Sequence, residues 1–203
     1  PDIDVMFSKN LPSLQQVKEY YGIPFENFAV VLFHPVTTEQ FRLKKDAEIF
    51  VNAMLQDNGN YVVIYPNNDM GTSTILKAYE SLIDHPRFRI FPSLRFEYFL
   101  RLLKNADFMM GNSSAGIREA PYYGIPSINL GSRQKNRAFG ETIIHADFDL
   151  ESINTAISTA RSMGKCEPQF DFGKGNSSDL FYEILSSPGF WDASHQKQFN
   201  DLA

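Results

Sequence analysis

Residues 28–65 read FAVVLFHPVTTEQFRLKKDAEIFVNAMLQDNGNYVVIY, and this stretch establishes the class of fold. It begins and ends with continuous apolar runs, at 28–32 and 61–65. Between them, apolar residues recur from Leu43 to Leu55 at the spacing of one helical face. Because strands of a parallel sheet are covered on both sides, they are apolar throughout. The stretch therefore predicts a strand–helix–strand unit with two parallel strands.

The same alternation continues along the rest of the chain. Further apolar runs predict strands at 88–91, 107–110, 127–130 and 142–145. Helical spacing predicts helices between and after them, and an early helix over 14–21 has Ser13 as its N-cap and Gly22 as its stop. We therefore expect an α/β fold, a doubly wound Rossmann-like six-stranded parallel sheet, with residues 1–203 forming a single domain.

Composition limits the kinds of partner. The formal charge of −5 does not suit non-specific nucleic-acid binding. No apolar run approaches the roughly 20 residues of a membrane span, and the N-terminus has no signal-peptide pattern, so we expect a cytoplasmic protein without a membrane partner. The single cysteine, Cys166, cannot form an internal disulfide. Metal-ligand spacings such as C-x-x-C and H-E-x-x-H are absent, so we expect no metal and no cofactor.

The loop after the fourth predicted strand reads GNSSAGIREAP, from Gly111 to Pro121. Its small residues allow close approach of a ligand, and a helix starting at Ser114 directs N–H groups and its positive dipole end at a phosphate. The Ser113 and Ser114 hydroxyls add donors, and Glu119 could accept hydrogen bonds from a ribose diol. The alternative is a serine-capped helix in a tight turn, with Glu119 on the surface. No Gly-Lys-Ser/Thr ending follows, so the loop is not a P-loop.

Two more loops follow strand ends, where doubly wound sheets bind their ligands. His34 follows the first strand and precedes Pro35, which forces extended backbone, so His34 could pair with a phosphate or transfer a proton. The alternative is a histidine that hydrogen-bonds within a turn. After the second strand, Asn67 and Asp69 could bind sugar hydroxyls, or Asp69 or Thr72 could cap the next helix.

The loop after the fifth strand carries three cations in five residues, Arg133, Lys135 and Arg137. Lying at a strand end opposite the start of the Ser114 helix, they could neutralise a diphosphate, and arginine makes bidentate phosphate contacts. The alternative is a solvated basic loop.

These loops together resemble one family, the UDP-N-acetylglucosamine 2-epimerases. The blocks that carry the resemblance are, in the order of the family, FHPVTTEQ (33–40), YPNNDMG (65–71) and GNSSAGIREAPYYGIPSINLGSRQKNR (111–137). The Gly-Ser-Arg-Gln run at 131–134 is similar to the hydrolysing branch, whereas the non-hydrolysing branch has a motif of the T-E-R-P-E type there. Asn136 departs from the glycine usual in the hydrolysing branch, although asparagine tolerates left-handed backbone.

The resemblance implies a GT-B architecture, in which two Rossmann-like domains enclose the active site. This chain would be the C-terminal, UDP-binding domain, with the N-terminal domain absent. The resemblance also implies a role for each matching residue: Ser113, Ser114 and Gly116 on the diphosphate with help from Arg133, Glu119 on the ribose, backbone at Ser93 and Leu94 on the uracil, His34 as a catalytic group beside the diphosphate, and Asn67 and Asp69 on the sugar or its phosphate.

The implied substrate is UDP-N-acetylglucosamine or a 2,4-diacetamido analogue. A base removes the C2 proton while UDP leaves C1, and water adds to the resulting 2-acetamidoglucal with inverted C2 stereochemistry. The products are free N-acetylmannosamine and UDP, and preorganised donors stabilise the departing diphosphate. The carboxylates that move protons would lie in the absent domain, so the chain alone should be inactive. The full enzyme should form a homo-oligomer.

Two other interpretations stay open. A GT-B glycosyltransferase also binds a UDP-sugar through such a domain, although Gly-Ser-Arg-Gln combined with His34-Pro35 is not a transferase pattern. A non-catalytic, UDP-sugar-responsive module is the other, because the chain holds no complete catalytic set and the fold serves many functions.

Overall fold

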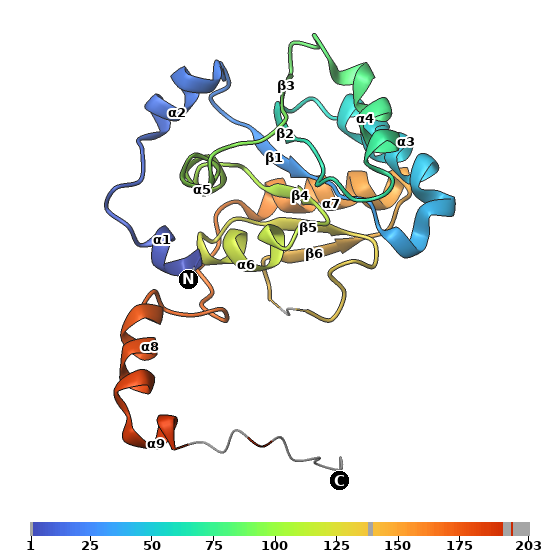
Figure 1. The fold of residues 1–203 in the computed structure, drawn as a ribbon. Helices are drawn as coiled ribbons and strands as arrows, with labels where there is room; N and C mark the ends of the chain where they lie inside the picture. The colour runs from blue at the N-terminus through green and yellow to red at the C-terminus, as the bar shows by residue number, and fades with distance from the viewer. Residues whose placement is uncertain (1, 138–139, 193–195, 197–203) are drawn as a thin grey trace.

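The computed structural model describes residues 2–137, 140–192 and 196, and a six-stranded parallel sheet lies at its centre (Figure 1). The strands are β1 (Ala29–Leu32), β2 (Tyr61–Ile64), β3 (Phe88–Phe91), β4 (Met109–Gly111), β5 (Ser127–Leu130) and β6 (Ile143–Ala146). Their order in the sheet is β3-β2-β1-β4-β5-β6, so the chain winds outward from the centre twice. The predicted fold class is confirmed, and each predicted strand is present with its ends shifted by two residues or fewer.

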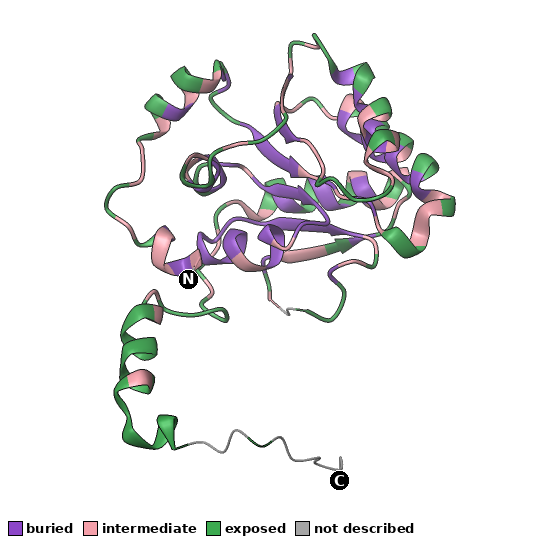
Figure 2. Ribbon diagram, in the orientation of Figure 1, coloured by how far each residue is buried: buried purple, intermediate pink, exposed green. Residues whose placement is uncertain are grey.

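Helices cover both faces of this sheet (Figures 1 and 2). One face packs against α3 (Gln40–Gln56), α4 (Thr72–Tyr79) and α7 (Leu150–Met163). The other packs against α1 (Asp2–Met6), α2 (Leu14–Tyr21), α5 (Phe96–Lys104) and α6 (Ala115–Tyr122). Two 3-10 turns, η1 (Thr37–Glu39) and η2 (Glu80–Leu82), precede α3 and follow α4. The predicted caps of α2 are confirmed, since Ser13 accepts the Gln16 N–H and Gly22 is left-handed.

The register brings the carboxyl ends of the central strands together. Leu32 at the end of β1 pairs with Ile64 of β2 and with Gly111 of β4. Gly111 has a φ of 143°, and a Cβ there would lie 2.0 Å from the Leu32 carbonyl oxygen. Glycine therefore lets β1 and β4 stay in contact up to the point where their loops diverge. This point, where the winding direction reverses, is where such sheets hold ligands.

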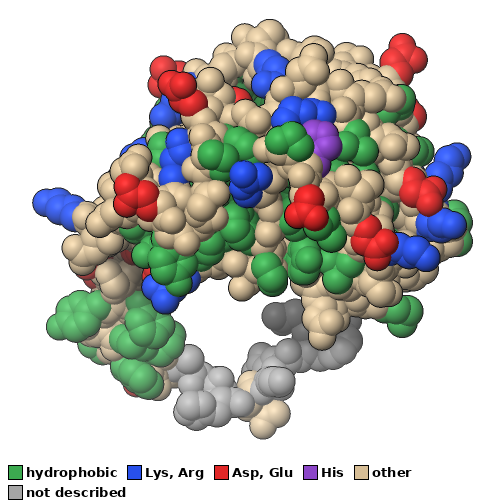
Figure 3. Space-filling model, turned by 90° about the horizontal axis from the view of Figure 1, so that it is seen from above, with side chains coloured by type: hydrophobic (Ala, Val, Ile, Leu, Met, Phe, Trp, Pro, Cys, Tyr) green, Lys and Arg blue, Asp and Glu red, His purple; other side chains and the backbone are tan. Residues whose placement is uncertain are grey.

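The C-terminal segment leaves the body of the fold. In α8 (Ser177–Ser186) and α9 (Pro188–Trp191) no residue is buried, and both helices extend away from the sheet (Figures 1 and 2). Their exposed large apolar side chains gather in one cluster, at the lower left of Figure 3, and are Leu180, Phe181, Tyr182, Ile184, Phe190 and Trp191. The single domain over 1–203 stays a prediction, because this arm buries no residue against the described body.

Candidate functional site

A cavity of about 390 Å³ opens at the carboxyl edge of the sheet. Its walls are mostly apolar and come from the ends of β1 and β2, the loop after β3 and the start of α5 and α6. Concave sites with apolar walls and a few polar groups are typical of ligand pockets. The cavity brings together four of the predicted site residues, which come from three loops: His34, Asn67, Ser93 and Leu94.

His34 is held neutral in this cavity. Its Nδ1 accepts a hydrogen bond from the Asn67 backbone N–H at 3.0 Å, which places the ring hydrogen of the neutral form on Nε2. Burial and then the charge of Arg133 lower the pKa of His34 to about 4. At neutral pH the ring is therefore a hydrogen-bond donor through Nε2. An anion bound beside it would raise that pKa and allow it to carry a proton.

Asn67 and Asp69 interact with each other. Asn67 lines the cavity and its Nδ2 donates to the Asp69 carboxylate, whereas Asp69 lies outside the cavity lining. The alternative in which Asp69 or Thr72 caps α4 is wrong, because the N-cap is Gly71 and no side chain bonds there. The Thr72 hydroxyl donates to the Asp69 carbonyl at 2.8 Å and so braces the loop.

The structure adds one residue that sequence reasoning missed, Asn112, which follows β4 and is 1% exposed. Its Oδ1 accepts the His34 N–H at 2.7 Å, and its Nδ2 donates to the His34 carbonyl at 2.8 Å. Its own carbonyl accepts from Arg133 Nη1 at 2.9 Å and from Gln134 Nε2 at 3.0 Å. Asn112 thus joins the loops after β1, β4 and β5. The one signal for it in the sequence was an amide side chain directly after a buried strand.

Arg133 is folded back onto this junction. Its bond to the Asn112 carbonyl fixes the guanidinium, and burial lowers the pKa of Arg133 from its usual value. A wholly solvated loop therefore does not describe Arg133, although Lys135 is exposed. Asn136 has a φ of 61°, the left-handed conformation that asparagine adopts in place of glycine. The departure from the family pattern at Asn136 is thereby accommodated by the backbone.

The turn into α6 shows separate roles for the small residues. The helix begins at Ala115, one residue later than expected, and Ser114 is its N-cap residue without a side-chain cap. Ser113 Oγ accepts the Ala115 N–H at 3.3 Å. A Cβ at Gly116 would lie 2.5 Å from Ser127 Oγ, so this glycine lets α6 pack closely on β5. A phosphate site at Ser113, Ser114 and Gly116 stays a prediction.

Glu119 is buried in α6, and the alternative that placed it on the surface is wrong. Glu119 is only 6% exposed, and its Oε2 has no hydrogen-bond partner among the described residues. Burial is the largest effect on the carboxyl group and raises the pKa of Glu119, with Arg118 opposing and Asp2 adding to the rise. A buried carboxylate oxygen without a partner is costly, and such groups concentrate at functional sites.

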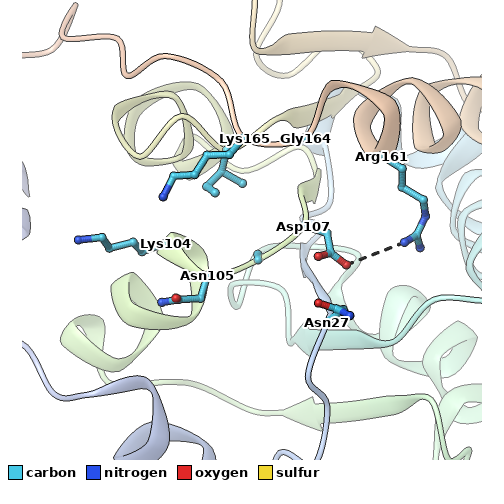
Figure 4. A pocket seen from close by; sticks show the side chains of 9 residues that line it. Asn27, Lys104, Asn105, Asp107, Arg161, Gly164 and Lys165 are labelled. Carbon is cyan, nitrogen blue, oxygen red and sulfur yellow. Dashed lines mark ion pairs between the residues drawn. The ribbon is translucent and has the colours of Figure 1, made fainter.

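A larger cavity of about 570 Å³ lies at the opposite, amino edge of the sheet (Figure 4). In it, Arg161 faces Asp107 at 3.9 Å and also pairs with Asp57 at 2.7 Å. Lys104 and Lys165 lie away from this pair (Figure 4). In this cavity, Arg161 is already engaged in ion pairs with Asp57 and Asp107. Doubly wound sheets also bind their ligands at the opposite, carboxyl edge. We therefore take the carboxyl edge as the candidate functional site, although the cavity there is smaller.

The described residues also bear on other kinds of ligand. Among them, no three His, Cys, Asp or Glu side chains are grouped to hold a metal ion. No described helix has the length and apolar content needed to cross a bilayer. Charges of both signs are interspersed with apolar side chains over the face in Figure 3, unlike the continuous basic surface typical of non-specific nucleic-acid binding.

The strand order and the loops at the switch point define a Rossmann-like α/β domain of the GT-B kind. The UDP-GlcNAc 2-epimerase of Methanocaldococcus jannaschii, solved with UDP-GlcNAc and UDP, matches with a TM-score of 0.68 at 17% identity, over 91% of this chain and 52% of that one. The Neisseria meningitidis UDP-GlcNAc 2-epimerase bound to UDP-GlcNAc matches with a TM-score of 0.65 at 15% identity, over 84% and 48%. At these identities the likeness is one of fold.

Sequence comparison supplies the family. The family model described as UDP-N-acetylglucosamine 2-epimerase matches residues 1–186, and the chain belongs to this family. It is 50% identical to the UDP-N-acetylglucosamine 2-epimerase of Neisseria meningitidis serogroup B, over all of this chain and 54% of the relative. It is 29% identical to the UDP-N,N'-diacetylbacillosamine 2-epimerase (hydrolyzing) of Legionella pneumophila, over 91% and 52%. The chain thus spans about half the length of the curated relatives it matches.

Proposed function

We propose that this chain is the UDP-binding domain of a hydrolysing UDP-N-acetylglucosamine 2-epimerase. The enzyme would convert UDP-N-acetylglucosamine, or a 2,4-diacetamido analogue, and water to UDP and free N-acetylmannosamine or its analogue. One observation carries the proposal: in a member of this family, an apolar cavity is lined by a neutral histidine, and Asn112 joins that histidine to a fixed arginine.

The nucleotide is proposed to lie along the carboxyl edge. The apolar cavity suits the uracil ring, which backbone groups at Ser93 and Leu94 would meet. The diphosphate would lie at the start of α6, where Ser113 and Ser114 add hydroxyl donors to the helix dipole. Arg133 would supply the opposing charge, because its guanidinium is already held near the same turn by Asn112.

Glu119 is the proposed partner of the ribose. A vicinal diol offers two donors, and a carboxylate with an unpaired buried oxygen gains most from such a partner. The rise in the pKa of Glu119 caused by burial would be reversed by these hydrogen bonds, which favour the charged form.

The chemistry would centre on the departing UDP. A base removes the C2 proton, the C1–O bond breaks, and the electron pair leaves with UDP to give 2-acetamidoglucal. Water then adds, with hydroxyl at C1 and hydrogen at C2 on the opposite face. The Nε2–H of His34 would donate to the diphosphate as negative charge grows on it, and Asn67 and Asp69 would contact the sugar side.

Two observations support the hydrolysing branch. Arg133 and Gln134 both donate to the Asn112 carbonyl, which links the Gly-Ser-Arg-Gln run to His34 in the candidate site. The relatives from Legionella pneumophila and Campylobacter jejuni, both 29% identical, carry the word hydrolyzing in their names. The glycosyltransferase interpretation has lost its support, because the chain belongs to the epimerase family.

A second domain is proposed to complete the active site. The chain spans about half the length of its curated relatives, and the described residues that line the cavity at the carboxyl edge include no carboxylate that could move the C2 proton. The apolar side chains of α8 and α9 support an additional packing partner, because helices with such a face normally bury it.

Proton NMR of the full-length enzyme acting on UDP-N-acetylglucosamine in D₂O tests the proposal. Free N-acetylmannosamine carrying deuterium at C2, together with UDP, is the outcome that supports it. A UDP-linked epimer would place the enzyme in the non-hydrolysing branch instead. Binding of UDP without any turnover would favour the non-catalytic module. Calorimetric titration of this chain with UDP, and with ADP as control, tests the nucleotide site separately.

A further inference from the structure

Asn112 continues the contact between β1 and β4 beyond the end of the strands. Its side-chain amide makes a reciprocal pair of hydrogen bonds with the backbone of His34, at 2.7 Å and 2.8 Å. The two residues are 78 positions apart in the chain. Because a side-chain amide has one acceptor and one donor group in a fixed plane, it sets both the distance and the orientation of the His34 backbone.

The main chain of the same residue holds the cationic loop. Its carbonyl accepts from both Arg133 and Gln134, at 2.9 Å and 3.0 Å. Gln134 is 1% exposed, and its Oε1 accepts a hydrogen bond from Arg137 at 2.9 Å. The Gln134 side chain therefore has a partner for both its nitrogen and its oxygen. A displacement of Asn112 would therefore move His34 and Arg133 together.

The neutrality of Asn112 matters for the charge of His34. The charged groups that act on His34 are Arg133, from the loop after β5, and Asp69, from the loop after β2. An aspartate at position 112 would add a carboxylate against the His34 backbone, and it could not donate to the His34 carbonyl when ionised. Among residues of this shape, only asparagine satisfies both backbone groups and adds no charge.

We propose that Asn112 is a positioning residue, which holds His34 and Arg133 at a fixed separation so that both donate to the same phosphoryl group. It acts through these two side chains. The identity of the ligand rests on the proposed function, whereas the control of His34 by Asn112 does not.

The first test measures the titration of His34 by NMR in protein labelled with ¹³C-histidine. The chain has four histidines, so His34→Gln identifies the signal. In Asn112→Asp the pKa of His34 should rise from about 4, because a carboxylate replaces the amide. The matched control is Asn129→Asp: Asn129 is 2% exposed, and its side chain contacts His145 at 3.0 Å instead of the His34 backbone. An unchanged His34 titration in Asn112→Asp, or the same change in both variants, overturns the proposal.

The second test uses turnover of the full-length enzyme and a variant with a smaller electrostatic effect. Asn112→Ser cannot bridge both backbone groups, and we expect kcat to fall about 100-fold, as for a displacement of roughly 1 Å. In a His34→Ala background the same substitution should lower kcat by less than about 10-fold, because one of its two targets is gone. Equal losses in both backgrounds would show that Asn112 acts through general destabilisation.

The two tests separate this proposal from the proposed function. A wild-type enzyme without epimerase turnover would refute the function while the His34 titration still decides the role of Asn112. Thermal unfolding of each variant shows that the compared proteins are folded. If Asn112→Asp does not fold, the His34 titration in Asn112→Ser decides instead. Loss of the two hydrogen bonds between Asn112 and the His34 backbone should expose the imidazole ring and bring the pKa of His34 closer to the usual 6.5. An unchanged titration overturns the proposal.

Discussion

Replacing Glu119 by glutamine should stabilise the free protein and at the same time weaken its binding of UDP. The residue is 6% exposed and its Oε2 lacks a hydrogen-bond partner among the described residues. Glutamine has nearly the same shape but no charge, so the substitution removes the buried charge without creating a cavity. The two effects have opposite signs because the carboxylate is poorly satisfied in the free protein and well satisfied by a diol.

The size of the stability effect follows from the burial. An unpaired buried polar group costs about 1–3 kcal/mol, and a neutral amide recovers part of this, so we expect a gain of about 1 kcal/mol at pH 7. For a domain of this length, that gain raises Tm by about 2–4 °C. Loss of charge-assisted hydrogen bonds to the ribose should cost about 1.5–3 kcal/mol, which weakens UDP binding about 10- to 150-fold.

The pH dependence gives an independent check on the cause. Burial raises the pKa of Glu119 above the unfolded value of 4.5, so the folded state keeps its proton to higher pH than the unfolded state. The stability that the folded state gains by keeping this proton on Glu119 is therefore complete below about pH 4.5, and it is lost as pH rises through the folded-state pKa of Glu119. The stabilities of the wild type and Glu119→Gln should converge at low pH and diverge toward neutral pH.

The assay is thermal unfolding from pH 4 to pH 8, with calorimetric titration of UDP at pH 7. Glu26→Gln is the matched control, because Glu26 is exposed in a loop and the substitution is the same. The reasoning is refuted if the stability difference between Glu119→Gln and the wild type does not change with pH. Unchanged UDP affinity in Glu119→Gln would remove Glu119 from the nucleotide site.

Three other substitutions test neighbouring parts of the site. Arg133→Lys should weaken UDP binding about 10-fold by calorimetry although it conserves charge, whereas Lys135→Arg should have little effect; equal affinities for all three proteins would contradict a bidentate contact. Because the diphosphate should raise the pKa of His34 from about 4, UDP binding near pH 6 should take up protons, which titrations in buffers of different ionisation enthalpy detect. His34→Gln should show less uptake, and uptake equal to that of the wild type would assign it to UDP itself. Gly111→Ala should lose about 3 kcal/mol or more in denaturant unfolding, because its Cβ would lie 2.0 Å from the Leu32 carbonyl, and Gly164→Ala, with open space around it, should lose less.

Local patterns were sufficient for the elements and for several of the site loops. Apolar runs identified the six strands of the described sheet. The signal was clearest for β1 and β2, which are apolar throughout and buried in the sheet, whereas β3 and β6 at its edges are only partly buried. Small errors remained at the ends: β4 begins at Met109 instead of Asp107, whose side chain faces Arg161 at the amino edge. The rule that ligands bind at carboxyl ends of strands then selected His34, Asn67 and Arg133, which the fold brings together around Asn112.

Which side chains are buried, and what they contact, depended on packing between distant segments. Glu119 read equally well as a surface residue, because helical spacing does not say that α5 and α1 cover this part of α6. For Asn112 the sequence showed only an amide directly after a buried strand and not its partner, since His34 lies 78 positions away. Periodicity depends on which face of an element is buried, and this is visible in neighbouring residues of the sequence. Periodicity therefore determined the strands and helices, and with them the edge of the sheet at which the candidate site lies. Hydrogen-bond partners and pKa values depend on distances between loops, which exist only once the sheet has assembled, and so Asn112, the neutral His34 and the buried Glu119 emerged from the folded chain alone.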